Sequence, residues 1–124
     1  MRPLKILYID DEADIREVAM LSLELDPCIE VRGESSGAAG IATATAWLPD
    51  AILLDVMMPS MDGPATLSRL RTNVATRHIP VIFITARAQS SEIADFFRQG
   101  ALEVITKPFN PMTLAAELRR KMAA

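Results

Sequence analysis

Residues 49–63 read PDAILLDVMMPSMDG, in which Asp55 interrupts an apolar run from Ala51 to Met58. Ala51–Leu54 shows no alternation of polar and apolar side chains, which is typical of a strand covered on both faces. Pro64 comes next and suits the first turn of a helix over Ala65–Arg71. The stretch therefore predicts a buried strand of a parallel sheet, with a carboxylate at its carboxyl end.

Four more strands of this kind are predicted elsewhere in the chain. Each is short and rich in aliphatic and β-branched residues, and most lack polar alternation. They are Lys5–Ile9, Ile29–Gly33, Val81–Thr85 and Glu103–Thr106. With the central run they give five candidate strands for one sheet.

The intervals between these strands carry apolar residues at helical spacing. This spacing predicts helices from Ile15 to Leu25, from the cap Ser36 to Trp47, over Ala65–Arg71, over Ser91–Gln99, and from Asn110 and Pro111 onward. Gly100 suits the end of the fourth helix, and Glu117 and Lys121 are expected to pair on the fifth. Alternating strands and helices predict one three-layer α/β domain over residues 1–124, with a five-stranded parallel sheet between two helical layers.

The composition excludes several classes of function. The chain has 124 residues, half of them apolar, and 16 acidic against 13 basic residues give a net charge of −3. This balance argues against direct nucleic-acid binding, which needs a basic surface. The lone Cys28 rules out an internal disulfide, and no apolar run approaches the roughly 18 residues of a membrane helix. We expect a cytoplasmic protein without membrane insertion.

Polar side chains stand where the predicted strands end. Asp10 and Asp11 follow the first strand, Asp55 the third and Lys107 the fifth, and Thr85 ends the fourth. In open parallel sheets, ligands bind outside the carboxyl ends of the strands. Two carboxylates about 4 Å apart repel by roughly 4 kcal/mol at an effective dielectric constant of 20, so aspartates gathered there require a cation. A small number of hard oxygen ligands favours Mg²⁺.

These side chains together suit phosphoryl transfer. The Lys107 ammonium and the Thr85 hydroxyl, beside a metal ion, would bind and neutralise a phosphoryl group. No serine or cysteine is placed beside the only histidine, His78, so Asp55 is the expected acceptor. An acidic pair alone could merely cap a helix, and a Lys-Pro pair could merely form a turn. Their joint occurrence at strand ends is what favours the site.

The motifs at these strand ends resemble those of the receiver domain of bacterial two-component response regulators. They are YIDDE at 8–12, PDAILLDVMMPSMDG at 49–63, IFITA at 82–86 and TKPF at 106–109, and the resemblance covers essentially the whole chain. It implies a flavodoxin-like (βα)5 fold with the strand order 2-1-3-4-5.

The resemblance also implies how the acidic residues divide their roles. Asp55 would be the phosphoacceptor. Asp11 would bind Mg²⁺ directly and Asp10 would bind it through water. Asp55 and the main-chain carbonyl of Met57 would complete the protein ligands of the metal.

By the same resemblance, Lys107 would pair with the phosphoryl group and Thr85 would hydrogen-bond to it. The Lys107–Pro108 peptide bond would be cis, which sequence physics alone makes a minority option. The chain departs from the family at Val104, where a tyrosine or phenylalanine usually stands three residues before the lysine. We therefore expect phosphorylation without the usual aromatic rotamer change.

The predicted function is a signalling switch rather than turnover of an external substrate. A sensor histidine kinase or a histidine phosphotransfer protein would donate the phosphoryl group, and an unidentified downstream protein would bind the phosphorylated chain. The protein itself is expected to be a monomer or weak dimer. A shuttle in a multistep phosphorelay is the alternative. A flavodoxin-like cofactor carrier is much less favoured, because residues 10–12 would repel a phosphate. An aspartate-based phosphatase typically has a second aspartate two positions after the nucleophile, where this chain has Met57.

Overall fold

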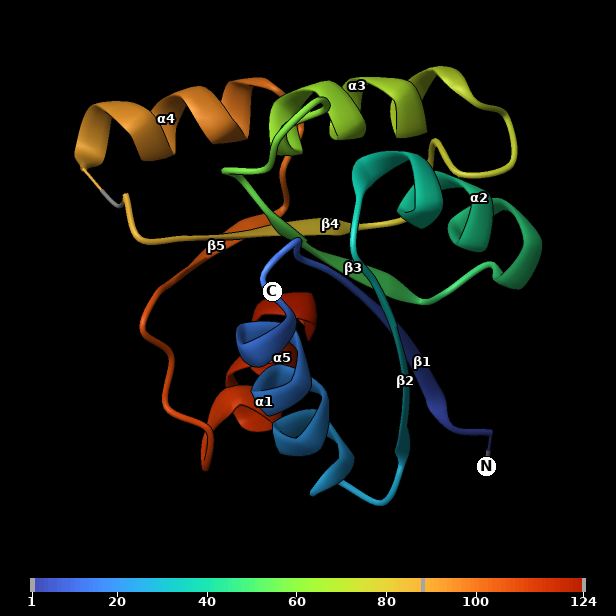
Figure 1. The fold of residues 1–124 in the computed structure, drawn as a ribbon, viewed down its shortest axis with the longest axis vertical. Coiled ribbons are helices and arrows are strands. Elements are labelled where there is room, and N and C mark those ends of the chain that lie inside the picture. The colour runs from blue at the N-terminus through green and yellow to red at the C-terminus, as the bar shows by residue number, and fades with distance from the viewer. Residues whose placement is uncertain (1, 88, 124) are drawn as a thin grey trace.

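A five-stranded parallel sheet lies at the centre of the computed structural model, which describes residues 2–87 and 89–123 (Figure 1). The strands are β1 (Leu4–Ile9), β2 (Ile29–Glu34), β3 (Ala51–Asp55), β4 (Val81–Thr85) and β5 (Glu103–Thr106). Their order is β2-β1-β3-β4-β5, and every pair of neighbours is parallel. The five predicted strands and their predicted order are confirmed.

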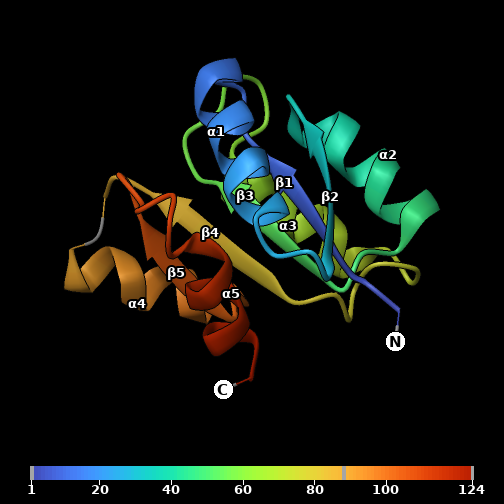
Figure 2. The same ribbon diagram turned by 90° about the horizontal axis from the view of Figure 1, so that it is seen from below.

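Helices cover both faces of this sheet. They are α1 (Ala13–Glu24), α2 (Gly37–Trp47), α3 (Gly63–Thr72), α4 (Ser90–Arg98) and α5 (Leu114–Ala123). The helices α1 and α5 lie on one face and α2, α3 and α4 on the other, as the two views in Figures 1 and 2 show. The three-layer architecture is confirmed. Within residues 2–87 and 89–123, no helix is long and apolar enough to cross a membrane.

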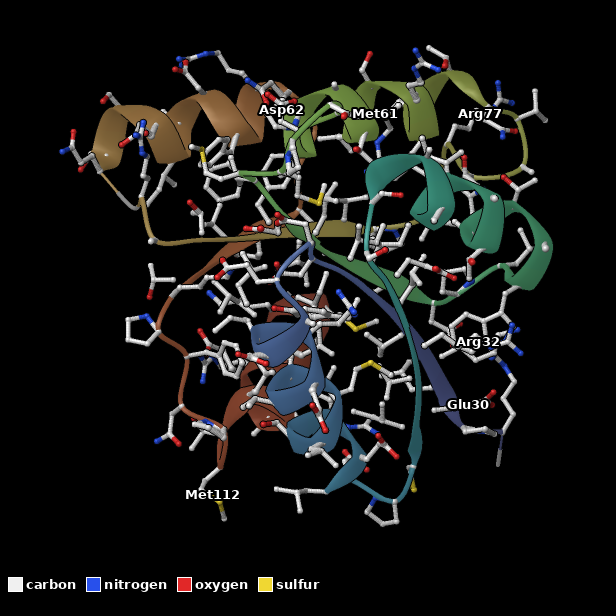
Figure 3. The ribbon with its side chains drawn as sticks, in the orientation of Figure 1. Glu30, Arg32, Met61, Asp62, Arg77 and Met112 are labelled. Carbon is white, nitrogen blue, oxygen red and sulfur yellow. The ribbon has the colours of Figure 1, made fainter. Side chains whose placement is uncertain are left out.

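Side chains of the strands point alternately into two cores, which fill the space between the sheet and the helices (Figure 3). On β1, Leu7 and Ile9 pack with the layer of α2, α3 and α4, whereas Ile6 and Tyr8 pack with α1 and α5. Every residue of β3 and of β4 is buried. A large aliphatic side chain buried in this way stabilises a fold by about 1.5–3 kcal/mol. Burial on both faces explains why the sequence of these strands lacks polar alternation.

The ends of several helices follow the sequence signals. The Ser36 hydroxyl accepts a hydrogen bond of 3.1 Å from the Ala39 N–H at the start of α2. At the end of α4, Gly100 has a φ of +106°, in the region that favours glycine. The N–H groups of Gly100 and Ala101 donate back to the carbonyls of the last helical turn, at 3.0 and 3.1 Å. This is a Schellman ending, as the position of Gly100 predicted.

The start of α5 differs from the prediction. The side-chain oxygen of Asn110 accepts a hydrogen bond of 2.9 Å from the Met112 N–H, as an N-cap would, but residues 111–113 form a turn ahead of the helix. Met112, 78% exposed, points away from the molecule in Figure 3, and the helix begins at Leu114. The helix therefore begins at Leu114 and not at the predicted Pro111.

The ion pair predicted on α5 is also different. Lys121 pairs with Glu103 of β5 at 3.5 Å, and no pair with Glu117 forms within 4.0 Å. The helix lies against the sheet, so a strand carboxylate supplies a partner that spacing along the helix cannot foresee.

Candidate functional site

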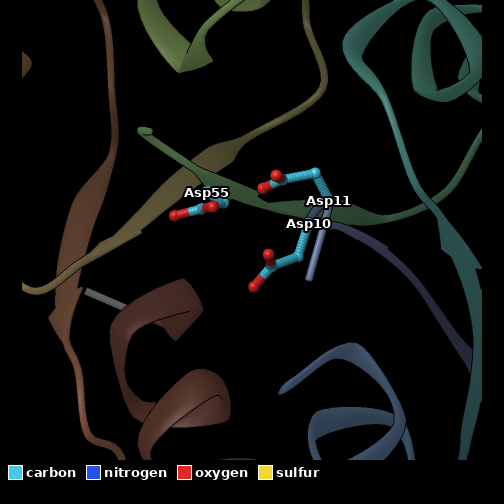
Figure 4. A group of neighbouring side chains, drawn as sticks. All are labelled: Asp10, Asp11 and Asp55. Atoms are coloured by element: carbon cyan, nitrogen blue, oxygen red, sulfur yellow. The ribbon is translucent and has the colours of Figure 1, made fainter. Parts of the chain in front are cut away.

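Three aspartates gather at the carboxyl end of the sheet. The strands β1 and β3 are neighbours, so Asp10 and Asp11, which follow β1, lie beside Asp55 at the end of β3. One carboxylate oxygen from each residue lies within 4.8 Å of the others, and Figure 4 shows the side chains converging. Asp10 and Asp55 are buried, whereas Asp11 is exposed. The cluster predicted from the strand ends is confirmed.

Lys107 joins two of these carboxylates. Its Nζ lies 3.0 Å from Asp10 Oδ2 and 3.2 Å from Asp55 Oδ1, and only 14% of its side chain is exposed. Its main-chain N–H donates to the carbonyl of Thr85 at 2.8 Å, which continues the pairing of β5 with β4. The Lys107–Pro108 peptide bond is cis, as the sequence resemblance implied.

Burial and mutual repulsion alter the acid–base behaviour of the cluster. Burial, followed by the charge of Asp10, raises the pKa of Asp55 to about 6, even though Lys107 opposes the shift. Burial alone would lower the pKa of Lys107, but its contacts with Asp10 and Asp55 outweigh burial and raise it. Lys107 therefore stays cationic, and a single ammonium leaves the three carboxylates with excess negative charge. Hard oxygen atoms with uncompensated charge fit Mg²⁺.

Asp10 is held by three donors. Its Oδ1 accepts from the Glu12 N–H at 3.0 Å, and its Oδ2 accepts from Lys107 and from the Tyr8 hydroxyl, the latter at 3.1 Å. Burial, and then the charge of Asp10, raises the pKa of Tyr8, so the phenol keeps its proton. The N-cap of α1 is Glu12, which makes no side-chain cap, so the simpler explanation of Asp10 and Asp11 as helix caps is wrong.

Thr85 is buried at the end of β4, the strand next to Asp55. Its hydroxyl oxygen accepts a hydrogen bond of 3.0 Å from the Arg87 N–H, within its own loop. Among the residues that the structure describes, no hydrogen bond joins this hydroxyl to the three aspartates. The residue is at the predicted edge of the sheet, but its side chain is engaged elsewhere.

The loop after Asp55 is shaped by a close approach. Met57, two residues on, has an exposed side chain, and the chain returns so that the Gly63 N–H donates to the Val56 carbonyl at 2.9 Å. A Cβ atom on Gly63 would lie 2.7 Å from the carbonyl oxygen of Asp55. Only glycine therefore lets α3 begin directly against the main chain of Asp55. The sequence analysis did not single out this requirement.

Val104 lies inside the core, 9% exposed, opposite Phe83 in the register of β4 and β5. Phe83 and Phe96 of α4 pack edge to face, with their ring centroids 5.0 Å apart. Valine is stiff about χ1 and too small to change the exposed area greatly by turning. Val104 is therefore a fixed core residue at the position where the family usually has an aromatic side chain that changes its rotamer.

An apolar groove of about 300 Å³ borders Lys107. Ile15 and Val18 of α1 form one side, and Pro108 and Phe109 after β5 form the other. Val18 is 43% exposed although it is apolar. This groove was not predicted from the sequence, because it is formed by two segments that are about 90 residues apart in the chain.

Comparisons with known proteins agree with this geometry. Residues 6–119 match the family model described as the response regulator receiver domain. The response regulator PleD of Caulobacter vibrioides is 40% identical over 117 residues, which cover 93% of this chain and 25% of PleD. The phosphate regulon transcriptional regulatory protein PhoB of Escherichia coli is 36% identical over 118 residues, which cover 95% of this chain and 51% of PhoB. The chain thus spans about a quarter to a half of the length of these curated relatives.

Solved structures show the same architecture. The chemotaxis protein CheY4 of Vibrio cholerae superposes with a TM-score of 0.87 at 30% identity, over 95% of this chain and 98% of CheY4. The N-terminal domain of a response regulator receiver protein from Methanoculleus marisnigri gives a TM-score of 0.78 at 33% identity, over 97% of each chain. The whole described fold, and not only the acidic cluster, is therefore shared with these proteins.

Proposed function

The chain belongs to the response regulator receiver domain family, and we propose from this premise that Asp55 accepts a phosphoryl group from a histidine kinase or a histidine phosphotransfer protein. Receiver domains act in signalling rather than as turnover enzymes. In this proposal, phosphorylation changes which downstream protein the chain binds. The protein would work in the cytoplasm as a monomer or weak dimer.

The observation that supports this proposal most directly is the contact of Lys107 with both Asp10 and Asp55, at 3.0 and 3.2 Å. An ammonium held between two buried carboxylates is a cation already in place beside the proposed acceptor. A phosphoryl group on Asp55 would add nearly two negative charges there. Lys107 could then exchange its carboxylate contacts for phosphoryl oxygens without leaving the site.

The proposed metal ligands are Asp11, Asp55 and the main-chain carbonyl of Met57, with Asp10 bound through water. When bound, Mg²⁺ would add positive charge to the oxygen atoms of the phosphoryl group. The two aspartates after β1 approach Asp55 closely, so their repulsion favours a cation among them. The exposed Asp11 gives the cluster an open side toward solvent.

In the transfer step, a carboxylate oxygen of Asp55 forms a bond to phosphorus while the phosphorus–nitrogen bond of the donor histidine breaks. The electron pair of that bond leaves with the imidazole. The protein supplies no base, because Asp55 reacts as an ionised carboxylate. Its pKa of about 6 keeps most of the acid ionised at neutral pH. Lys107 holds one oxygen of the carboxylate and thereby limits its rotation.

The apolar groove beside Lys107 suits a protein as the donor. Val18 and Phe109 offer apolar surface beside Lys107, which itself contacts the carboxylates, as an apolar helix face on a donor protein would require. A small-molecule donor such as acetyl phosphate needs no such contact. The groove therefore favours a partner that binds across α1 and the segment after β5.

Labelling by acetyl phosphate tests the proposal. We expect one phosphoryl group on the wild-type protein in the presence of Mg²⁺, and none on Asp55→Asn or after EDTA is added. Asp62→Asn is the matched control, because Asp62 is an exposed aspartate that caps α3 and does not belong to the cluster. Undiminished labelling of Asp55→Asn would show that another residue is the acceptor.

A phosphate shuttle in a multistep phosphorelay is the second candidate function, and Val104 favours it. A shuttle does not depend on the rotamer change of an aromatic side chain, because it passes its phosphoryl group on and does not signal through a conformational change. Rapid return of phosphate from Asp55 to a histidine phosphotransfer protein, without a change in other binding partners, would support the shuttle over the switch.

A further inference from the structure

Tyr8 is the only tyrosine in the chain, and it is fully buried in β1. It lies two residues before Asp10, so the alternation of the strand puts both side chains toward α1 and α5. Its hydroxyl donates a hydrogen bond of 3.1 Å to Asp10 Oδ2. The ring packs among apolar neighbours such as Ile6 and Leu53, so phenylalanine would fill the same space. The hydroxyl therefore has a role separate from that of the ring.

The same oxygen of Asp10 accepts from Lys107 at 3.0 Å. Asp10 is completely buried, so its carboxylate depends on protein donors rather than on bulk solvent. Leaving one oxygen of a buried carboxylate without a donor costs free energy, even though the Glu12 N–H still donates to Oδ1. With Tyr8 present, Oδ2 keeps one donor when Lys107 moves to a phosphoryl group. Without the hydroxyl, the departure of Lys107 would leave this oxygen without a protein partner.

We propose that Tyr8 is a positioning residue that makes Lys107 free to leave Asp10. This inference rests on the proposed function, because Lys107 has a reason to move only when a metal ion, or a metal ion with a phosphoryl group, enters the cluster. Tyr8 acts in two ways. It shares Asp10 Oδ2 and so weakens the hold of Asp10 on Lys107, and it keeps Asp10 oriented after Lys107 has moved.

The test is calorimetric titration with Mg²⁺ alone of four proteins: wild type, Tyr8→Phe, Lys107→Ala and the double variant. Lys107 competes with Mg²⁺ for the carboxylates, so a tighter hold on Lys107 weakens metal binding. We expect Tyr8→Phe to weaken Mg²⁺ binding by about three- to tenfold when Lys107 is present, the size of one typical hydrogen bond. In the Lys107→Ala background, the same change should cause no loss of Mg²⁺ affinity.

A matched control removes a different buried hydroxyl. Thr76 is fully buried before β4 and donates to the Leu70 carbonyl at 2.8 Å, away from the carboxyl ends of the strands. Thr76→Val should lower the midpoint of unfolding in urea and leave Mg²⁺ affinity unchanged. Urea unfolding of Tyr8→Phe and of the double variant, measured in parallel, verifies that each is folded.

Equal losses of Mg²⁺ affinity from Tyr8→Phe in both backgrounds would overturn the proposal, because Tyr8 would then act on Asp10 independently of Lys107. No loss in either background would also overturn it. If the wild type itself binds no Mg²⁺, the proposed function fails and this inference fails with it. Nuclear magnetic resonance offers a test without variants, because it can follow the exchange of the Tyr8 hydroxyl proton with water. This proton should remain protected from exchange after Mg²⁺ is added. Rapid exchange would contradict the role.

Discussion

The hydroxyl oxygen of Thr85 accepts a hydrogen bond of 3.0 Å from the main-chain N–H of Arg87. This bond joins the last residue of β4 to the segment that leads into α4. A phosphoryl group on Asp55 that drew the hydroxyl toward itself would turn the Thr85 side chain and break this bond. The loop would then have to find a new arrangement, which is a known route for switching.

We therefore predict that the largest response to beryllofluoride and Mg²⁺ occurs in the loop after β4 and at the start of α4. Backbone amide exchange should change most at Ala86, Arg87 and Gln89–Glu92, and little at Val104. The Val104 side chain is buried and stiff, so it cannot transmit the change by rotation.

Thr85→Ala supplies the control for this prediction. It should still bind beryllofluoride, but the exchange changes in the loop should shrink, because the hydroxyl that links the site to the loop is gone. Changes centred on β5 with a fixed loop would contradict the mechanism and point to another residue in the place of the aromatic ring.

Lys107→Ala should separate metal binding from activation. The affinity for Mg²⁺ should be equal or slightly tighter, because a competing cation leaves Asp10 and Asp55. Affinity for beryllofluoride in saturating Mg²⁺ should fall by at least tenfold, since the charge-assisted contact to the phosphoryl mimic is lost. Titrations of both ligands measure this, with Lys121→Ala as the control, because Lys121 pairs with Glu103 instead. A collapse of Mg²⁺ affinity would make Lys107 a structural residue.

Asp55→Asn should stabilise the metal-free protein at neutral pH. The pKa of Asp55 is raised to about 6 in the fold, above its value near 4 in the unfolded chain, so the ionised carboxylate destabilises the fold. This destabilisation, about 2–3 kcal/mol at pH 7, disappears as the pH falls from above 6 toward 4. Urea unfolding in EDTA should show the variant more stable at pH 7.5, with a smaller advantage at pH 5.

Asp26→Asn provides a control of opposite sign. The hydrogen bond from Arg119 lowers the pKa of Asp26, so its ionised form is favoured in the fold. Removing that charge should not stabilise the protein at any pH above the pKa of the unfolded chain. A stabilised Asp26→Asn would mean that the reduction of net negative charge, and not the buried site, explains the effect of Asp55→Asn.

Val18→Glu should impair phosphorylation by a protein donor but not by acetyl phosphate. Val18 lines the apolar groove, whose lining includes none of the three aspartates. A charge there would meet the apolar face of a donor and weaken binding by about tenfold or more, since a buried unpaired charge is costly. Rates of phosphotransfer from a cognate histidine kinase and from acetyl phosphate are compared.

Val74→Glu is the control, because Val74 is a 73% exposed residue that is not part of the groove. Equal loss with both donors would mean that the change damages the site itself.

The strands and helices could be predicted from the sequence because local patterns sufficed for them. The run Ala51–Leu54 is apolar at every position, as a strand buried on both faces must be, and Asp55 marks its end. Convergence of Asp10 and Asp11 on Asp55 followed once β1 and β3 were neighbours, an order that the family resemblance supplied. Residue types at strand ends thus carried most of the candidate site.

Features that depend on side-chain direction across the fold were not predicted. The bond from Tyr8 to Asp10 needs both the alternation of β1 and a carboxylate turned inward, and only the first is visible in sequence. Lys121 pairs with Glu103 of β5, and the turn that Asn110 closes ends before α5 begins at Leu114. Each of these outcomes was decided by which group lay nearest in space or by competition between local hydrogen bonds.

The proposed acceptor Asp55 and the proposed phosphoryl ligand Thr85 lie on opposite faces of the sheet. Strand alternation directs Asp10 and Asp55 toward the side of α1 and α5, whereas Thr85 follows Val81 and Phe83 toward the side of α3 and α4. A donor seated on α1 therefore leaves the outer surface of α4 uncovered. The donor protein can therefore bind on one side of the sheet and the downstream protein on the other, so that neither needs to displace the other.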